Sequence, residues 1–282
     1  MPTNPPTDRG GAFVHANGID IHYTERGSGE PLVLLHGGLI STGPIWDGAP
    51  ISYNDQLDRF GRHFRVIAPD TRASGATVHK EGTPSASLLA DDVLGLIEAL
   101  ALDRPMICGF SEGALTATIV SIRNPDSVRA VVNDAGFDLL DPKSHMFAQA
   151  RVLLGGSPEA THADPDAAIA NFAQMGMGEM FDMVRADHDS AQGDGYWRRF
   201  LELTFQRWTR SPGFTFDDLR AATAPTLVLT GDCDMFCSVE DAVTTFRKLP
   251  NAELAVMPNH DHHIGTPKVD ASIEFLRRHC DG

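Results

Sequence analysis

A serine between two glycines is the first candidate for chemistry. Residues 109–113 read Gly-Phe-Ser-Glu-Gly, a G-x-S-x-G pattern centred on Ser111. The apolar run 105–108 leads directly into this pattern, and a segment of helical period, 114–122, leads out of it. Such a sharp turn from strand to helix holds the hydroxyl exposed at a helix N-terminus, where the helix dipole favours an oxyanion, and glycines at these positions avoid collisions. The pattern therefore predicts nucleophilic attack on a carbonyl by Ser111.

A serine hydroxyl reacts well only when a histidine accepts its proton and a carboxylate orients that histidine. Two later segments follow apolar runs at 225–230 and 253–257, and so lie where parallel strands end and α/β proteins place catalytic groups. Together they supply two carboxylates and three histidines as candidates: Asp232, Asp234, His260, His262 and His263.

An alternative interpretation is that the same cluster binds a metal ion. Cys233 and Asp261 lie among the candidates, and all of these side chains are metal-ligand types. Neither segment shows an HExxH or a CxxC spacing. A metal site would also leave the pattern around Ser111 unexplained. We therefore expect no catalytic metal and no cofactor.

Short apolar runs alternate with helical segments along most of the chain, the pattern of an α/β protein with a mostly parallel central sheet flanked by helices. Asn17-Gly18 predicts a tight hairpin near the start. The strand pattern stops between residues 137 and 216, which predicts a helical lid there, inserted into a core formed by 12–136 and 217–282. Residues 1–11, rich in proline and glycine, are expected to form a flexible tail. The expected strands are 13–15, 19–23, 31–35, 64–68, 105–108, 130–133, 225–230 and 253–257, and the expected core helices are 88–100, 114–122, 239–249 and 269–278.

With these motifs the chain resembles the α/β-hydrolase family over nearly its whole length. His36-Gly37-Gly38 follows the third strand, as the family's oxyanion-loop motif does, and Pro-Asp-Thr-Arg at 69–72 follows the fourth. The continuation Ala-Ser-Gly at 73–75 departs from the usual glycine pattern, and Phe110 stands where many members carry histidine. The first departure touches a structural turn and the second a variable position. The resemblance implies the α/β-hydrolase fold and serine-hydrolase activity.

The resemblance also assigns roles to individual residues. The family's order of nucleophile, acid and base, with a G-x-x-D offset for the acid, selects Asp234 and leaves Asp232 a supporting part. The usual offset of four residues past a proline selects His262 as the base, with His263 and His260 as alternatives if the register slips. The oxyanion hole is implied to consist of the backbone N–H groups of Gly38 and Glu112.

The predicted lid and Glu112 bear on the substrate. The lid is rich in methionine and aromatic residues, and we expect Met180 and Trp197 to bind a small, largely apolar ester, lactone, thioester or activated C–C compound. A second interpretation is that these side chains only pack the lid. Glu112 resembles the acidic residue that hydrolases of aminoacyl esters use to receive an ammonium group; otherwise only its backbone N–H matters.

The wider family leaves other functions open. A non-hydrolytic member of the fold is the alternative: an acyltransferase, a perhydrolase, a cofactor-free oxygenase or a ligand-binding receptor. Epoxide hydrolases and haloalkane dehalogenases use an aspartate nucleophile, so Ser111 argues against both.

Composition and charge exclude several classes. Among 282 residues, 38 acidic and 23 basic side chains give a net charge of −15, which repels nucleic acid and anionic membranes. The 42% apolar content is that of a globular protein, and no apolar run is long enough to span a membrane. Four cysteines without a CxxC pair fit a reducing compartment. We expect a cytoplasmic protein with a small-molecule substrate; the pattern does not predict an oligomeric state.

Overall fold

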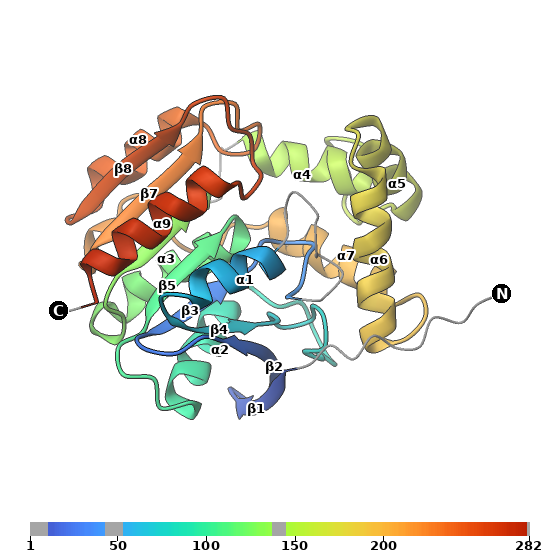
Figure 1. Cartoon of the computed structure of the whole chain (residues 1–282). Helices are drawn as coiled ribbons and strands as arrows, with labels where there is room; N and C mark the ends of the chain where they lie inside the picture. The colour runs from blue at the N-terminus through green and yellow to red at the C-terminus, as the bar shows by residue number, and fades with distance from the viewer. Residues whose placement is uncertain (1–10, 43–52, 137–144, 281–282) are drawn as a thin grey trace.

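The computed structural model of the chain describes residues 11–42, 53–136 and 145–280 (Figure 1). An eight-stranded sheet in the order β1-β2-β4-β3-β5-β6-β7-β8 forms its centre. β2 pairs antiparallel with β1 and with β4, and every other pairing in this sheet is parallel. The predicted fold class is therefore confirmed. The strands are β1 (Ala12–Ala16), β2 (Ile19–Arg26), β3 (Pro31–Leu35), β4 (Arg65–Pro69), β5 (Met106–Phe110), β6 (Val131–Asp134), β7 (Thr226–Gly231) and β8 (Ala252–Met257).

The hairpin at the start of the sheet forms where the sequence predicts it. Asn17 and Gly18 both have positive φ, 47° and 75°, as a two-residue turn of this kind requires. The tail predicted over 1–11 lies outside the described residues except for Gly11.

Helices cover both faces of the sheet, because successive side chains of a buried strand point to opposite faces. Leu34 of β3 packs on the side of α1 (Tyr53–Gly61) and α9 (Thr266–Arg278). Its neighbour Leu35 packs on the other side, with α2 (Ala86–Ala99), α3 (Glu112–Arg123) and α8 (Val239–Lys248). The sequence pattern predicted these helices apart from α1. Two single turns of 3-10 helix occupy Pro125–Ser127 and Asp218–Ala221.

Four further helices stand between β6 and β7, within the segment predicted as a lid. They are grouped to one side of the sheet in Figure 1 and consist of α4 (His145–Gly155), α5 (Pro165–Gln174), α6 (Gly178–Gln192) and α7 (Tyr196–Trp208). Buried side chains such as Phe172, Phe200 and Trp208 join them to the core on the α1 and α9 face. The first residues of the predicted lid, 137–144, lie outside the described part of the chain. No helix among the described residues is both long and apolar enough to cross a bilayer.

Candidate active site

The turn between β5 and α3 holds Ser111 in a strained conformation. Ser111 has φ 52° and ψ −118°, outside the regions that residues with a side chain usually adopt. A Cβ atom on Gly109 would overlap the carbonyl of Gly113, and one on Gly113 would overlap the carbonyl of Leu35. The N–H of Ser111 donates to the carbonyl of Asp134 at 2.8 Å, which fixes the turn on the neighbouring strand. The two glycines of the motif are thus required by this close packing.

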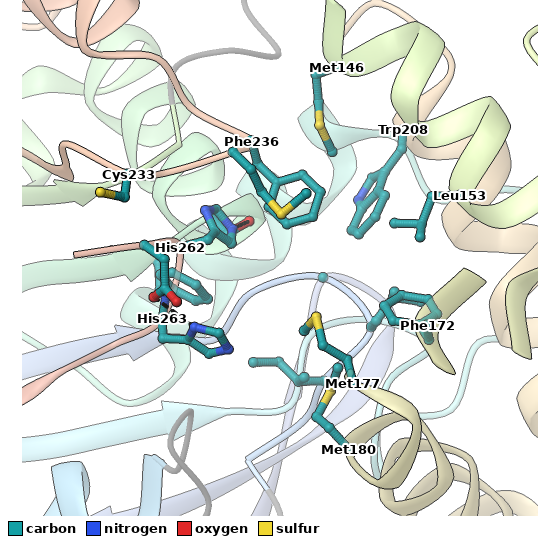
Figure 2. A pocket seen from close by; sticks show the side chains of 17 residues that line it. Met146, Leu153, Phe172, Met177, Met180, Trp208, Cys233, Phe236, His262 and His263 are labelled. Atoms are coloured by element: carbon teal, nitrogen blue, oxygen red, sulfur yellow. Dashed lines mark hydrogen bonds and ion pairs between the residues drawn. The ribbon is translucent and has the colours of Figure 1, made fainter. Parts of the chain in front are cut away.

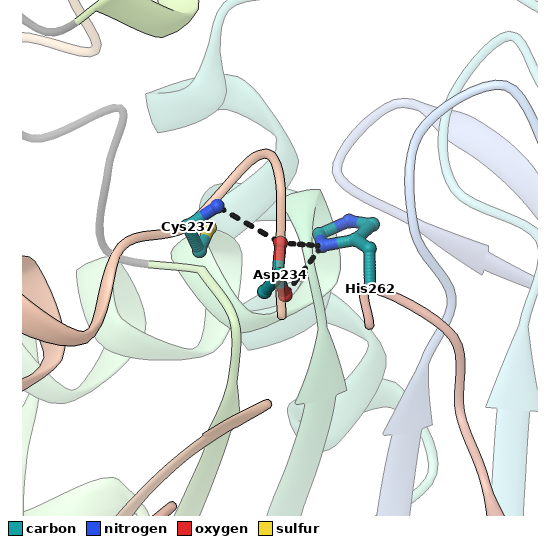
Figure 3. A group of neighbouring side chains, drawn as sticks. All are labelled: Asp234, Cys237 and His262. Carbon is teal, nitrogen blue, oxygen red and sulfur yellow. Dashed lines mark hydrogen bonds and ion pairs between the residues drawn. The ribbon is translucent and has the colours of Figure 1, made fainter. Parts of the chain in front are cut away.

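Ser111, His262 and Asp234 form a continuous chain of hydrogen bonds. The Oγ of Ser111 lies 3.1 Å from Nε2 of His262. Nδ1 of His262 lies 3.0 and 2.9 Å from the two carboxylate oxygens of Asp234 (Figure 3). The N–H groups of Phe236 and Cys237 donate to the same carboxylate, each at 2.9 Å. Burial by itself would raise the pKa of Asp234, but these hydrogen bonds and the charge of His262 lower it. The carboxylate is therefore ionised and able to orient the imidazole.

A cavity of about 150 Å³ opens on Ser111 and His262 (Figure 2). Its walls come from the loop after β3, from the triad loops and from helices α4, α5, α6 and α7. Apolar side chains make up most of the surface. The described residues that line it are Gly38, Leu39, Ile40, Phe110, Ser111, Met146, Leu153, Phe172, Met177, Met180, Trp208, Cys233, Met235, Phe236, Asp261, His262 and His263.

Several known proteins are similar to this chain in sequence or in structure. Residues 32–268 match the alpha/beta hydrolase family. The chain belongs to this family. The 2-(acetamidomethylene)succinate hydrolase of Mesorhizobium japonicum is 26% identical, over 93% of this chain and 92% of the relative. The 2-hydroxy-6-oxo-6-(2'-aminophenyl)hexa-2,4-dienoic acid hydrolase of Metapseudomonas resinovorans is also 26% identical, over 95% and 91%. A meta-cleavage product hydrolase from Pseudomonas fluorescens shares the fold with a TM-score of 0.73 at 18% identity, covering 95% of this chain and 98% of that one.

Of the two residues that we predicted to bind substrate in this α/β-hydrolase, only Met180 lines the cavity. The prediction for Trp197 is wrong. Its ring is buried within the lid, between the guanidinium groups of Arg185 and Arg198 at 4.9 and 4.6 Å, and it meets the edge of Phe181. Trp208, at the other end of α7, faces the cavity instead. Trp197 therefore belongs to the packing of the lid.

The loop after β3 is built to bring Gly38 close to Ser111. Nδ1 of His36 donates to the carbonyl of Gly37 at 2.7 Å, and Nε2 accepts the N–H of Thr71 at 3.0 Å. Burial lowers the pKa of His36, so the ring is neutral in this tautomer. A Cβ atom on Gly38 would overlap the ring of Trp208, so only glycine fits. Gly38 and Ser111 line the same cavity, which is compatible with an oxyanion hole at this point.

The carboxylate of Glu112 is fully engaged inside the protein. It accepts two hydrogen bonds from Arg207, at 2.5 and 2.9 Å, and one from Nε1 of Trp208 at 2.9 Å, and all three side chains are buried. The interpretation of Glu112 as a receptor for a substrate ammonium group is therefore wrong. Its backbone N–H is the first of α3 and has no partner within the helix, which keeps the predicted oxyanion role open. Sequence reasoning missed Arg207, which lies 95 residues away.

The other predicted carboxylate and histidines lie apart from the triad. Asp232 is exposed and accepts the N–H of His260 at 3.3 Å, a contact that closes the turn between the two loops. His263 pairs with Asp261, and their Nδ1 and Oδ1 atoms are 2.7 Å apart. Asp234, Cys237 and His262 also form a group whose ligand-type atoms lie within 4.8 Å of one another. The hydrogen bonds of Asp234, and that from the Cys237 thiol to the carbonyl of Ala135, account for this group, so we assign no metal to it.

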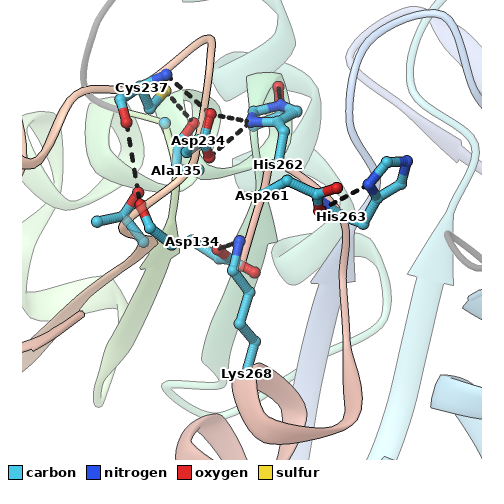
Figure 4. Close-up of polar contacts among 12 residues, drawn as sticks. Asp134, Ala135, Asp234, Cys237, Asp261, His262, His263 and Lys268 are labelled. Atoms are coloured by element: carbon cyan, nitrogen blue, oxygen red, sulfur yellow. Dashed lines mark hydrogen bonds and ion pairs between the residues drawn. The ribbon is translucent and has the colours of Figure 1, made fainter. Parts of the chain in front are cut away.

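A buried ion pair lies beside the triad and was not predicted. Nζ of Lys268 is 3.0 Å from Oδ1 of Asp134, and both side chains are buried (Figure 4). Asp134 ends β6, the strand whose carbonyl holds Ser111, while Lys268 is in the first turn of α9, just after the loop of His262. Burial raises the pKa of Asp134, and the charge of Lys268 acts against that rise. The pair ties the loop of His262 to the strand next to the nucleophile.

Proposed function

We propose that this α/β-hydrolase cleaves small, largely apolar esters, lactones, thioesters or activated C–C bonds through an acyl-enzyme on Ser111. The observation that carries the proposal is the chain of hydrogen bonds from Ser111 through His262 to Asp234, opening on a mostly apolar cavity. Neither lysine nor arginine is among the described residues that line that cavity. The two relatives are named for acids. A carboxylate would find no lysine or arginine partner among the described lining residues, so we favour uncharged acyl groups here.

The proposed reaction uses the chain of hydrogen bonds from Ser111 to Asp234. The Oγ of Ser111 attacks the substrate carbonyl as Nε2 of His262 accepts its proton, and Asp234 stabilises the imidazolium that forms. The N–H groups of Gly38 and Glu112 bind the oxyanion of the tetrahedral intermediate. His262 then protonates the leaving group, and the acyl group remains on Ser111. Water, deprotonated by His262, attacks this acyl group and releases the acid and free Ser111.

The test is turnover of p-nitrophenyl esters by the wild type and by Ser111→Ala. We expect the substitution to lower kcat by about 10⁴-fold or more. A fluorophosphonate should abolish the wild-type activity and add its mass to the peptide that carries Ser111, whereas a chelator should have no effect. Retention of more than a tenth of the activity by the alanine variant would overturn the proposal. Labelling of Ser111 without any ester turnover would favour a non-hydrolytic role in the same fold.

A further inference from the structure

The loop of His262 carries a second histidine and carboxylate that the proposed mechanism does not use. Nδ1 of His263 is 2.7 Å from Oδ1 of Asp261, and the backbone N–H of His263 donates to the same oxygen at 3.0 Å. These two contacts fix the ring relative to its own backbone. Figure 4 shows that His263 points to the opposite side of the loop from Asp234. Both His263 and Asp261 line the cavity (Figure 2).

The position of His263 matters because the cavity offers few polar groups. Apart from Ser111 and His262, the polar groups in its described lining belong to Cys233, Asp261, His263 and Trp208, and Nε1 of Trp208 already donates to Glu112. Asp261 already accepts the backbone N–H of His263 and lies 2.7 Å from its Nδ1. The Cys233 thiol interacts with Asp232, which raises the pKa of the thiol. Nε2 of His263 makes no hydrogen bond to any residue that the structure describes. It is therefore a polar atom available to a substrate in a mostly apolar cavity.

The contact with Asp261 decides what Nε2 can bind. A carboxylate only accepts hydrogen bonds, so the 2.7 Å contact requires the proton on Nδ1. In the neutral ring Nε2 then carries a lone pair and accepts a hydrogen bond. The negative charge of Asp261 also opposes an anionic ligand next to the ring. The ligand group that fits is an uncharged donor such as a hydroxyl or an amide N–H.

We propose that His263, oriented by Asp261, determines substrate specificity by accepting a hydrogen bond from a hydroxyl or amide N–H of the substrate. The inference rests on the proposed function, since it concerns a substrate bound in the cavity that opens on Ser111. It narrows the substrate class from apolar acyl compounds to acyl compounds with one uncharged hydrogen-bond donor away from the reacting carbonyl.

The test compares pairs of p-nitrophenyl esters that differ by one hydroxyl, for example hexanoate against a series of hydroxyhexanoates with the hydroxyl on successive carbons. For the best-placed hydroxyl, the wild type is expected to favour the hydroxy ester about tenfold in kcat/KM, as a net hydrogen bond of ordinary strength would give. His263→Phe keeps a ring but removes the acceptor, and should bring this ratio to about one. His263→Gln retains an acceptor oxygen and should keep part of the preference, while Asp261→Asn should weaken it by releasing the ring.

The chain offers a matched control in the exposed pair His15 and Asp20, whose Nδ1 and Oδ1 atoms are 2.8 Å apart outside this cavity. His15→Gln should leave the ratio of the two esters at the wild-type value. A wild-type ratio near one for every isomer, or an unchanged preference in His263→Phe, would overturn the inference.

The outcome is separable from that of the proposed function. Dependence of the plain ester on Ser111 tests the proposed function, whereas the ratio of the two esters tests His263 alone. If neither ester is turned over, the same ratio is measured as dissociation constants for hexanamide and the hydroxyhexanamides by calorimetry. Equal constants for these amides would again overturn the inference.

Discussion

The sheet edge and the helices α4–α7 meet at Ser111 but contribute different kinds of side chain. The loops after β3, β5, β7 and β8 bring polar groups whose hydrogen bonds fix them individually, as at His36 and Asp234. The four helices bring mainly apolar side chains such as Met177, Met180 and Phe172, which have no directional partner. The polar side chains around Ser111 are thus held in place by hydrogen bonds at the sheet edge, whereas the shape of the cavity depends on how α4–α7 pack.

A strong polar link joins the two regions beside the nucleophile. Glu112 is the first residue of α3, directly after Ser111, and its partners Arg207 and Trp208 are the last two residues of α7. Because Trp208 also packs on Gly38 and lines the cavity, this link sets the position of α7 relative to the proposed oxyanion hole. Substitutions on the sheet side and on the helix side of this link should therefore have different consequences.

The largest effect is expected on the sheet side, at Asp234. Asp234→Asn replaces the carboxylate by an amide that favours the wrong imidazole tautomer, and should lower kcat on a p-nitrophenyl ester by about 10⁴-fold. Asp232→Asn is the matched control, because that carboxylate is exposed and its contacts with the Cys233 thiol and the N–H of His260 lie outside the hydrogen bonds that link Ser111, His262 and Asp234. It should cost less than about tenfold. The reverse ranking would transfer the role of the acid to Asp232.

The next effect concerns the link between the regions. Arg207→Met leaves the buried carboxylate of Glu112 without its cation, and should lower the free energy of unfolding by about 3–5 kcal/mol in urea titrations. The double variant Glu112→Gln with Arg207→Met removes both charges and should be more stable than Arg207→Met alone. If the losses in free energy of unfolding measured for the single variants Glu112→Gln and Arg207→Met simply added up in the double variant, Glu112 and Arg207 would not be coupled.

A smaller, pH-dependent effect is expected at the ion pair beside the triad. In Lys268→Met the ammonium group no longer opposes the effect of burial, which raises the pKa of Asp134, so the folded variant keeps a proton that the unfolded chain releases. A group with a raised pKa in the folded state makes folding less favourable as the pH rises. The free energy of unfolding should therefore fall relative to the wild type above about pH 4, by up to about 1.4 kcal/mol per pH unit, in urea titrations at several pH values.

The control for this effect removes the carboxylate as well. The double variant Lys268→Met with Asp134→Asn has no group left to titrate at this place, so the additional pH dependence of Lys268→Met should disappear. Parallel curves for Lys268→Met and the wild type would mean that Asp134 stays ionised without Lys268.

The two regions also differ in how far the sequence predicts them. The elbow at Ser111, the carboxylate at Asp234 and the histidine at His262 lie at short, fixed offsets from strand ends, so local geometry restricts each of them. The contact of Glu112 with Arg207 has no such signal, because it depends on how α7 docks on α3. Helix α1 was also missed; it contributes only Leu57 and Phe60 to the buried core among its described side chains.

The error at Trp197 has a geometric cause. Trp197 and Trp208 are 11 positions apart in α7, which is close to three full turns, so both side chains project from the same face of the helix. They are separated along the helix axis by about 16 Å, however, at 1.5 Å per residue. The cavity reaches the end of α7 that carries Trp208 and stops short of Trp197. Residue type and periodicity give the face of a helix, but not which part of that face borders a cavity.

The smallest expected effect distinguishes a helix side chain that lines the cavity from one that only packs between helices. Met180→Ala removes part of the cavity wall and so enlarges the cavity. It should increase kcat/KM for long acyl chains relative to short ones by roughly tenfold, the effect associated with one or two methylene contacts. Trp197→Leu removes the ring between Arg185 and Arg198 and should lower the melting temperature without altering the chain-length preference. The measurement is a series of p-nitrophenyl esters from acetate to decanoate, with thermal unfolding of each variant. A chain-length shift in Trp197→Leu as large as that in Met180→Ala would mean that the cavity extends to the far end of α7, because a packing residue alone changes all chain lengths equally.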